Sequence, residues 1–373
     1  MLSYSDIEKY VQMTAHWPLE FWEEFENDWL VHRVLPAAKR NPLYEEAESI
    51  RDIEDLEDYP TIKWDDVDRM IVRLGGPDEL ITAPPAASWY SSGTSGRRKI
   101  VWSSEDDLDM YRRVFGRRLY SMGIGPKARA LILGAPGGYA SAIYPKLGLD
   151  WLAETVYVPF TQMGEYADKI LSDRYDVLLT LTPVAYLLAA EEGAKQLMGM
   201  IGRAPIISDL AVRSKRRRLQ KIFAYCQVLM AGDFRTDFQD RLLSDFYGRP
   251  TCLTHASTEV MTAGGECLDR TTRYHKGEMH PAFDDAIPLI IPLPEMEKER
   301  LNPEYEPKKL LLSRAPHGMI GEAVFTVNSD CFVRLNYRTS DIVRKGQDKT
   351  DCPTPLPTYE ILGRVSRKVD EPR

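Results

Sequence analysis

The chain has 373 residues, of which 43% are hydrophobic and 28% are charged, so it can build a large folded core and is not an intrinsically disordered chain. Its formal net charge of -8 argues against a general nucleic-acid-binding surface, which usually carries a basic excess, and favours a small-molecule partner. The scattered cysteines, the absence of a signal peptide and an apolar stretch at 176–190 too short for a bilayer predict a cytoplasmic protein that does not enter the membrane.

The first part of the chain, residues 1–85, is predicted to be a helical region that packs on the main domain. Aromatic residues recur there close to the helical period, and we expect them to face the core: Trp17, Phe21, Trp22, Phe25 and Trp29. Farther along, Pro60 precedes a short predicted helix. Asp65 and Asp66 lie near its start, where carboxylates interact favourably with the helix dipole.

The remainder of the chain alternates between strands and helices. Residues 129–135, 176–181 and 226–232 read as buried strands separated by amphipathic, helix-like segments, which indicates βαβ units and a mostly parallel sheet. Residues 321–327 and 331–343 have the shorter period typical of antiparallel strands. The Pro-rich stretch from Pro288 to Leu310 predicts a surface loop or an edge segment, since proline disrupts central strands. The predicted fold class is α/β.

A polar loop interrupts this pattern at "SSGTSG", residues 91–96, and is followed by Arg97, Arg98 and Lys99. Glycine lets backbone amides converge on an anion, and hydroxyl groups add further donors, so the composition suits phosphate binding. The Walker A spacing is absent. Taken alone, the segment is equally compatible with a mobile polar hairpin.

Further motifs follow in a fixed order: "AGDF" at 231–234, "HASTEV" at 255–260, "YRTSDIV" at 337–343 and "ILGRVSRK" at 361–368. Together with the polar loop, this set of motifs resembles the adenylate-forming superfamily. Within that superfamily, the sequence is most similar to the phenylacetate-CoA ligase branch. The resemblance implies layered α/β sheets with a smaller β-rich subdomain. It also implies an adenylate-forming core at 86–365, followed by a hinge remnant and tail at 366–373.

The resemblance assigns roles to individual residues around ATP and Mg²⁺. It assigns the β- and γ-phosphates to the backbone and hydroxyl groups of Ser91, Ser92, Gly93, Thr94, Ser95 and Gly96. It assigns catalytic roles to Arg97, Thr258 and Glu259. The residues expected to bind the adenine and the α-phosphate are Gly232, Asp233, Phe234, His255, Ala256, Ser257 and Thr258. Asp341 and Arg364 would hold the ribose, and Glu259 would bind Mg²⁺. Each residue alone also has an ordinary alternative, such as capping a turn or pairing on the surface.

The implied reaction joins a carboxylic acid to AMP and releases pyrophosphate. The acid-binding segment is expected at Gly137, Gly138, Tyr139, Ala140, Ser141 and Tyr144. The small residues leave volume for a flat aromatic acid and the tyrosines offer stacking faces, although small residues also permit tight helix–sheet packing.

The sequence departs from the family pattern in several places. The family usually has Lys after the second Gly of the polar loop, and this chain has Arg97 there. Ser340 replaces a Gly before the ribose-binding acid, so the turn at Ser340 must accommodate a side chain. The mobile C-terminal domain of the family is expected to be absent, which puts CoA ligation in doubt. A zinc site among Cys267, His275, His280 and Cys352 is less expected than free side chains, because no compact ligand spacing occurs.

Short relatives suggest what could follow adenylation. Acyl-protein synthetases transfer the acyl group to a cysteine, for which Cys352 is a candidate here, and adenylating proteins of phenazine antibiotic biosynthesis prepare a phenazine carboxylate for reduction. A reductase or an acyl-acceptor protein is thus an expected partner, and an oligomer is possible. The alternatives are a nucleotide- or aromatic-acid-binding protein that has lost turnover, or a scaffold subunit.

Overall fold

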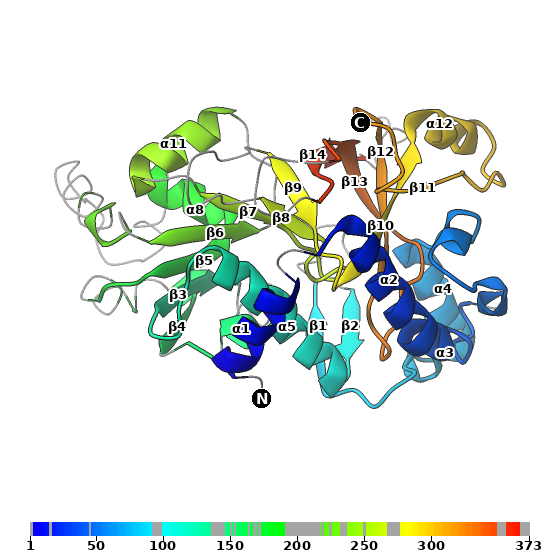
Figure 1. The fold of residues 1–373 in the computed structure, drawn as a ribbon, viewed down its shortest axis with the longest axis horizontal. Helices are drawn as coiled ribbons and strands as arrows, with labels where there is room; N and C mark the ends of the chain where they lie inside the picture. Colours follow the sequence, from blue (N-terminus) through cyan, green and yellow to red (C-terminus); the bar gives the residue numbers. More distant parts are fainter. Residues whose placement is uncertain are drawn as a thin grey trace. The chain divides into compact units, whose positions relative to one another are not determined.

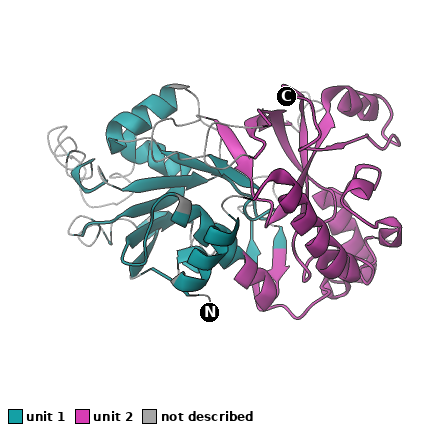
Figure 2. Cartoon of the chain, viewed as in Figure 1, with its two compact units in different colours: residues 1–14, 89–100, 111–276 teal, residues 15–88, 101–110, 277–373 magenta. Residues whose placement is uncertain are grey.

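The structure is a computed structural model. In it the chain folds into two compact units (Figure 2). Unit 1 comprises residues 1–14, 89–100 and 111–276, and unit 2 comprises residues 15–88, 101–110 and 277–373. The structure describes the chain except for residues 1–2, 15–16, 45, 92–98, 136–145, 150, 153, 163–164, 167–169, 171–172, 191–216, 218–219, 224–225, 232–236, 249–250, 267–276, 349–355 and 366–373. Each unit is built from segments that are distant in sequence.

Unit 1 contains a mainly parallel sheet with the strand order β8-β7-β6-β5-β3-β4. Its strands are β3 (Arg129–Gly134), β4 (Glu154–Pro159), β5 (Val177–Leu181), β6 (Gln227–Ala231), β7 (Cys252–His255) and β8 (Gly264–Glu266). All neighbours up to β7 pair in parallel, and β8 pairs antiparallel to β7. The three buried strands predicted from the sequence are therefore confirmed as β3, β5 and β6.

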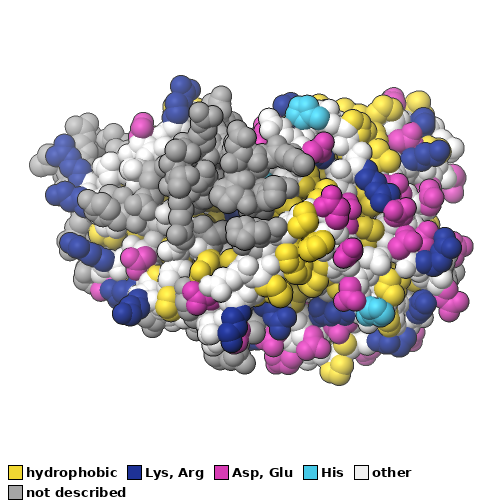
Figure 3. Space-filling view, in the orientation of Figure 1, with side chains coloured by type: hydrophobic (Ala, Val, Ile, Leu, Met, Phe, Trp, Pro, Cys, Tyr) yellow, Lys and Arg dark blue, Asp and Glu magenta, His cyan; other side chains and the backbone are white. Residues whose placement is uncertain are grey.

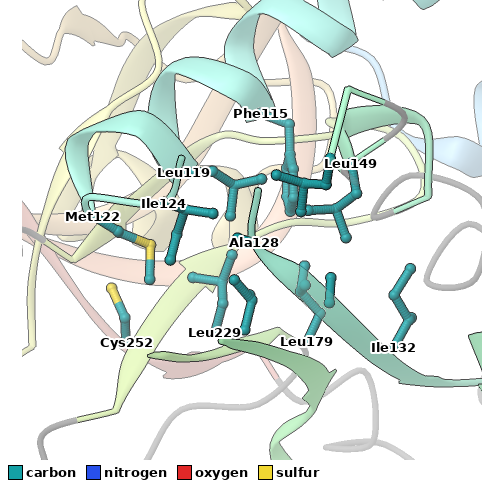
Figure 4. Close-up of a cluster of buried hydrophobic side chains, with 13 residues drawn as sticks. Phe115, Leu119, Met122, Ile124, Ala128, Ile132, Leu149, Leu179, Leu229 and Cys252 are labelled. Atoms are coloured by element: carbon teal, nitrogen blue, oxygen red, sulfur yellow. The ribbon is translucent and has the colours of Figure 1, made fainter. Parts of the chain in front are cut away.

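Helices accompany this sheet on both faces (Figure 1). They are α1 (Tyr4–Thr14), the 3₁₀ turn η5 (Phe160–Gln162), α8 (Thr182–Ala189) and α11 (Asp237–Tyr247), with α5 (Glu105–Ser121) and strands β1 (Ala87–Tyr90) and β2 (Ile100–Ser103) crossing the unit boundaries. Phe115 and Leu119 of α5 belong to one buried hydrophobic cluster with Ile132, Leu179 and Leu229 from three adjacent strands (Figure 4). Burial of both sheet faces explains why these strands read as continuous apolar runs.

Arg118 of α5 joins strands β7 and β8. Its Nη2 donates to the carbonyl oxygen of Glu266 at 2.6 Å, to that of Leu253 at 3.3 Å and to Cys252 Sγ at 3.0 Å. The Glu266 carboxylate in turn accepts the backbone N–H of Leu253 at 2.6 Å. One guanidinium and one carboxylate thus fix the strand that leads into the "HASTEV" segment.

Unit 2 contains an antiparallel sheet with the order β11-β10-β12-β13-β14-β9. Its strands are β9 (Glu278–Pro281), β10 (Ala286–Pro292), β11 (Leu310–Leu311), β12 (Ile320–Val327), β13 (Tyr337–Lys345) and β14 (Tyr359–Arg364). Its helical segments are α2 (Leu19–Trp29), η1 (Leu30–Val34), α3 (Leu35–Ala38), η2 (Ala47–Ser49), η3 (Glu54–Glu57), α4 (Trp64–Leu74), η4 (Asp78–Leu80) and α12 (Leu293–Leu301). The fold is mixed α/β, as predicted. Among the described helices, none is both long enough and apolar enough to cross a bilayer.

The predicted aromatic face lies on and beside α2. Trp22 and Trp29 are buried, and Trp22 packs against Phe283 and Leu356. Phe21 is 51% exposed, so the expectation that it faces the core is wrong. It directly precedes Trp22, and neighbouring helical residues point about 100° apart, which turns Phe21 toward solvent.

The visible face of unit 2 carries interspersed acidic and basic side chains (Figure 3).

The Pro-rich stretch begins with a buried strand, which corrects its prediction as a loop or edge segment. Strand β10 lies between β11 and β12, and α12 follows it directly. The carbonyl oxygen of Pro288 accepts the backbone N–H of Leu312 at 2.9 Å, so the proline nitrogen also faces the β11 side. Because β11 has only two residues, the missing N–H falls beside a short strand and the ladder with β12 stays complete.

Replacing Gly321 of β12 with alanine should destabilise the fold. An added Cβ would lie 2.0 Å from the carbonyl oxygen of Ile291 on β10, and a backbone atom in a central strand cannot easily move away. We expect a loss of about 2–3 kcal/mol in the free energy of unfolding, measured by urea denaturation. The control is Gly76→Ala, where an added Cβ meets no atom within 4 Å. Equal stabilities of the two variants would contradict this packing.

Lys309 gives a pH-dependent test of unit 2. Its Nζ is buried and donates to the carbonyl oxygens of Glu57 and Tyr59, and burial lowers the pKa of the ammonium group from 10.5 to about 8. Between these pH values the folded state loses a proton that the unfolded state keeps, so stability from this residue rises with pH.

Relative to Lys309→Met, the wild type should therefore gain up to about 3 kcal/mol in unfolding free energy as the pH rises from 8 to 10.5. Urea denaturation across this range measures the difference. Lys308→Met, at an exposed neighbouring position, serves as the control. A constant difference between the wild type and Lys309→Met would show that the ammonium group pays no burial cost.

Candidate functional site

The polar loop is closed at its base by Ser91 and Lys99. The backbone N–H of Ser91 donates to the carbonyl oxygen of Lys99 at 3.0 Å, and the backbone N–H of Lys99 donates to Ser91 Oγ at 3.0 Å. These reciprocal bonds fix where the loop leaves and rejoins the body of unit 1. The Ser91 hydroxyl oxygen therefore has a structural partner in addition to its predicted role toward phosphate.

The "HASTEV" segment forms a tight turn after β7. His255 is buried and pairs across the ladder with Gly264 of β8, while Ala256, Ser257 and Thr258 are half-buried. The backbone N–H of Ser257 donates to the carbonyl oxygen of Val260 at 3.3 Å, and Ser257 Oγ accepts the backbone N–H of Val260 at 2.9 Å. The turn is thereby closed around Thr258 and Glu259.

Lys99 and Glu259 join the loop to this turn within unit 1. The Lys99 ammonium group donates to Glu259 Oε1, and the two side chains are 21% and 7% exposed. The ion pair connects positions 160 residues apart. A carboxylate so far removed from water needs a positive partner, and Lys99 supplies it.

The sequence motifs indicate Arg97, and not Lys99, as the cation of the site. Both belong to the same cationic run, and Lys99 is identified here by its contact with Glu259. Arg97 itself lies outside the described residues. The signal available in the sequence was that Lys99 directly precedes a strand, where its backbone is anchored.

The donor set at Glu259 suits Mg²⁺ if phosphate oxygens complete it. Mg²⁺ is commonly bound by one or two carboxylates together with substrate phosphates and water. In the described part of the chain, no group of three or more His, Cys, Asp or Glu side chains is arranged to hold a metal ion. Among the described residues, Glu259 would be the carboxylate available to the ion once the Lys99 ammonium group has moved away.

Asp341 and Arg364 meet on adjacent strands of unit 2. They occupy opposite positions of β13 and β14, and Arg364 Nε donates to Asp341 Oδ1 at 2.6 Å. The Asp341 side chain is 7% exposed and that of Arg364 is 63% exposed, so the carboxylate is fixed while the guanidinium reaches solvent. The two residues assigned to the ribose are thus direct neighbours.

Ser340 has a left-handed backbone conformation, with φ of 66°. This finding agrees with the sequence argument that a glycine would suit the position before Asp341. The backbone N–H of Ser340 donates to Glu322 Oε1 at 3.1 Å, and its carbonyl oxygen accepts the N–H of Val365 at 2.8 Å. Glu322 was not predicted as a site residue, although it is the single charged side chain within the apolar run 320–327.

Several predicted residues lie outside the described part of the chain. They are the loop residues Ser92, Gly93, Thr94, Ser95, Gly96 and Arg97, the adenine segment Gly232, Asp233 and Phe234, and the acid-binding segment Gly137, Gly138, Tyr139, Ala140, Ser141 and Tyr144. The same holds for Cys267, His275 and Cys352. The described cysteines Cys226, Cys252 and Cys331 are buried thiols.

Comparison with known proteins finds similarity in structure but not in sequence. The sequence matches no protein-family model and no curated protein. The structure is similar to 2-hydroxyisobutyryl-CoA ligase in complex with 2-HIB-AMP and CoA, with a TM-score of 0.70, 14% identity, and coverage of 94% of this chain and 70% of that one. It is also similar to the acyl acid amido synthetase AtGH3.15 in complex with 2,4-DB, with a TM-score of 0.63, 15% identity, and coverage of 99% and 72%.

A third similar structure is the Vibrio cholerae adenylation domain AlmE in complex with glycyl-adenosine-5'-phosphate. Its TM-score is 0.50 at 14% identity, and the match covers 79% of this chain and 50% of that one. At these identities the likeness concerns the fold and not the residues of the site. The chain has the fold of adenylate-forming enzymes, as the sequence motifs predict.

Proposed function

We propose that this protein uses ATP to activate a carboxylic acid as an acyl-adenylate. The observation that carries the proposal is the Lys99–Glu259 ion pair, which joins the base of the polar loop to the turn of the "HASTEV" motif. The sequence resemblance assigns both segments to the triphosphate and its metal ion. Their contact across 160 positions is the arrangement that such a shared role requires.

In the proposed reaction, a carboxylate oxygen of the substrate attacks the α-phosphorus of ATP. A new bond forms between that oxygen and phosphorus, the bond from the α-phosphorus to the bridging oxygen breaks, and pyrophosphate leaves with the electron pair. Atoms and charges balance without a further reactant. The protein then contributes by positioning the two substrates and neutralising phosphate charge.

The described residues have distinct tasks in this proposal. Glu259 would hold Mg²⁺, which supplies positive charge against the phosphates when bound. The Lys99 ammonium group, released from Glu259, would donate to phosphate oxygens, and Thr258 would donate to the α-phosphate. Asp341 would accept the ribose hydroxyls, with Arg364 fixing its carboxylate.

We further propose that the acid is aromatic, as in a phenazine carboxylate, and that a reductase or an acyl-acceptor protein takes the activated group. Support comes from the sequence of the acid-binding segment, which combines small residues with Tyr139 and Tyr144. A secondary-metabolite pathway would use such chemistry.

Replacing Glu259 with Gln should lower Mg²⁺-dependent exchange between pyrophosphate and ATP by about 100-fold or more, because the neutral amide is a poor ligand for a hard cation. The measurement is isotope exchange in the presence of the acid substrate, with circular dichroism to check folding. The matched control is Glu154→Gln, which removes a partly exposed carboxylate of unit 1 that pairs with Arg129. Undiminished exchange in Glu259→Gln would contradict the metal-binding role.

A panel of acids tests the substrate proposal. Fused-ring aromatic carboxylic acids should support faster pyrophosphate exchange in the wild type than aliphatic acids of similar size, because the tyrosines would stack on a flat ring. Tyr139→Ala should reduce this preference about tenfold. Preference for aliphatic acids would refute the aromatic assignment. ATP binding by calorimetry without exchange on any acid would indicate a nucleotide-binding protein that lacks turnover.

A further inference from the structure

A carboxylate buried in the sheet of unit 2 contacts the backbone next to Asp341. Glu322 on β12 is 3% exposed, and its two oxygens have different partners. Oε1 accepts the backbone N–H of Ser340 at 3.1 Å, and Oε2 accepts Arg338 Nε at 3.0 Å as well as Arg338 Nη2. Both partners belong to the "YRTSDIV" motif, on the strand next to β12.

The orientation of Glu322 is fixed by a chain of charged groups. Arg338 Nη1 donates to both oxygens of Glu299 on α12, at 2.7 Å and 2.8 Å, and Lys63 Nζ donates to Glu299 Oε1 at 2.7 Å. Burial works against the charged form of Glu299, but the hydrogen bonds from Lys63 and Arg338 outweigh it and lower the pKa of that carboxyl group. The guanidinium fork therefore has fixed carboxylates on two sides, which a lysine could not bind in the same geometry.

The Glu322 carboxylate accepts the backbone N–H of Ser340, which the ladder between β12 and β13 does not pair. The ladder between β12 and β13 pairs Val324 with Arg338 and then Glu322 with Ile342, so the residues between them form a bulge on β13. Ser340 lies in this bulge with φ of 66°, a conformation that is unfavourable for a residue with a side chain. A partner for its N–H is needed to hold it there.

The bulge also determines where Asp341 lies. Thr339 Oγ1 accepts the backbone N–H of Asp341 at 3.2 Å and donates to the carbonyl oxygen of Ala323 at 3.1 Å. Together with the Glu322 bond, this contact fixes the backbone on both sides of the peptide that carries Asp341. The Asp341 carboxylate is thereby placed opposite Arg364.

We propose that Glu322 is a positioning residue for nucleotide recognition: it holds the Ser340 bulge so that Asp341 presents its carboxylate to the ribose hydroxyls of ATP. This inference rests on the proposed function and adds to it the residue that positions Asp341 for ribose recognition. Glu322 itself does not contact the nucleotide. Its effect passes through Ser340 to Asp341.

The test uses Glu322→Gln in the full chain. Glutamine has the same shape, but its amide nitrogen is a donor, so it can accept from Ser340 or from Arg338 and not from both. We expect the wild type to prefer ATP to 2′,3′-dideoxy-ATP in pyrophosphate exchange, measured as a ratio of kcat/KM. Glu322→Gln should reduce that ratio at least tenfold, mainly through a higher KM for ATP.

The matched control is Glu360→Gln, which removes a partly exposed carboxylate that pairs with Arg344 across β13 and β14. It should leave the nucleotide preference unchanged. If Glu322→Gln lowers the melting temperature but keeps the wild-type preference for ATP, its role is only structural and the proposal is overturned.

A second variant tests the route through Ser340. Glycine adopts positive φ without steric cost, so Ser340→Gly should lessen the need for Glu322. The double variant Glu322→Gln/Ser340→Gly should therefore recover part of the ATP preference that Glu322→Gln loses. Additive losses in the double variant would show that Glu322 does not act through the bulge.

Amide hydrogen exchange separates this proposal from the proposed function. If the wild type binds no ATP, the enzymatic assignment fails, yet the bulge can still be examined. Exchange in a peptide spanning 338–343 should be at least tenfold faster in Glu322→Gln than in the wild type and in Glu360→Gln. Equal exchange in all three proteins would overturn the role of Glu322.

Discussion

The candidate site residues depend on one constraint: a charged group that leaves water must find charged or hydrogen-bonding partners within the fold. Glu322 meets this constraint through Arg338, and Glu259 meets it through Lys99. The first pairing joins two neighbouring strands, and the second joins positions 160 residues apart. Because an unpaired charge would be costly, these pairings restrict the geometry of turns that have no regular hydrogen-bond ladder of their own.

Arginine has a similar task in each unit. In unit 1, Arg118 joins β7 to β8 through carbonyl oxygens, just before the turn that carries Glu259. In unit 2, Arg338 joins carboxylates of β12 and α12 beside the bulge that carries Asp341. A planar guanidinium with several donors can bind two or three acceptors at fixed angles. The turns are therefore supported by side chains from neighbouring elements and not only by their own sequence.

Regular elements could be predicted from the sequence where a single local signal dominates. The strands β3, β5 and β6 are buried on both faces, so their apolar runs are unambiguous, and α4 begins four residues after Pro60. The prediction failed where context decided the outcome. Pro288 normally argues against a central strand, but it is tolerated here because its nitrogen faces the two-residue strand β11.

The motifs select candidate site residues, but they do not indicate the side chains that pair with them. The motifs indicated Glu259 and Asp341, and the substitution at Ser340 correctly suggested an unusual backbone. Nothing local to "YRTSDIV" indicates that its bulge is held from the preceding strand, because Glu322 and Ser340 are joined only by sheet register. Partner assignments of this kind depend on long-range pairing, which a motif does not encode.

The Lys99–Glu259 pair shows how such a pairing can serve chemistry as well as stability. A buried carboxylate that is proposed to bind a metal ion must remain charged before the metal arrives, and a neighbouring ammonium group provides that compensation. In the proposed function Glu259 would hold Mg²⁺, and the Lys99 ammonium group would then be available to the phosphates that accompany the metal. Charge is thus balanced both before and after nucleotide binding.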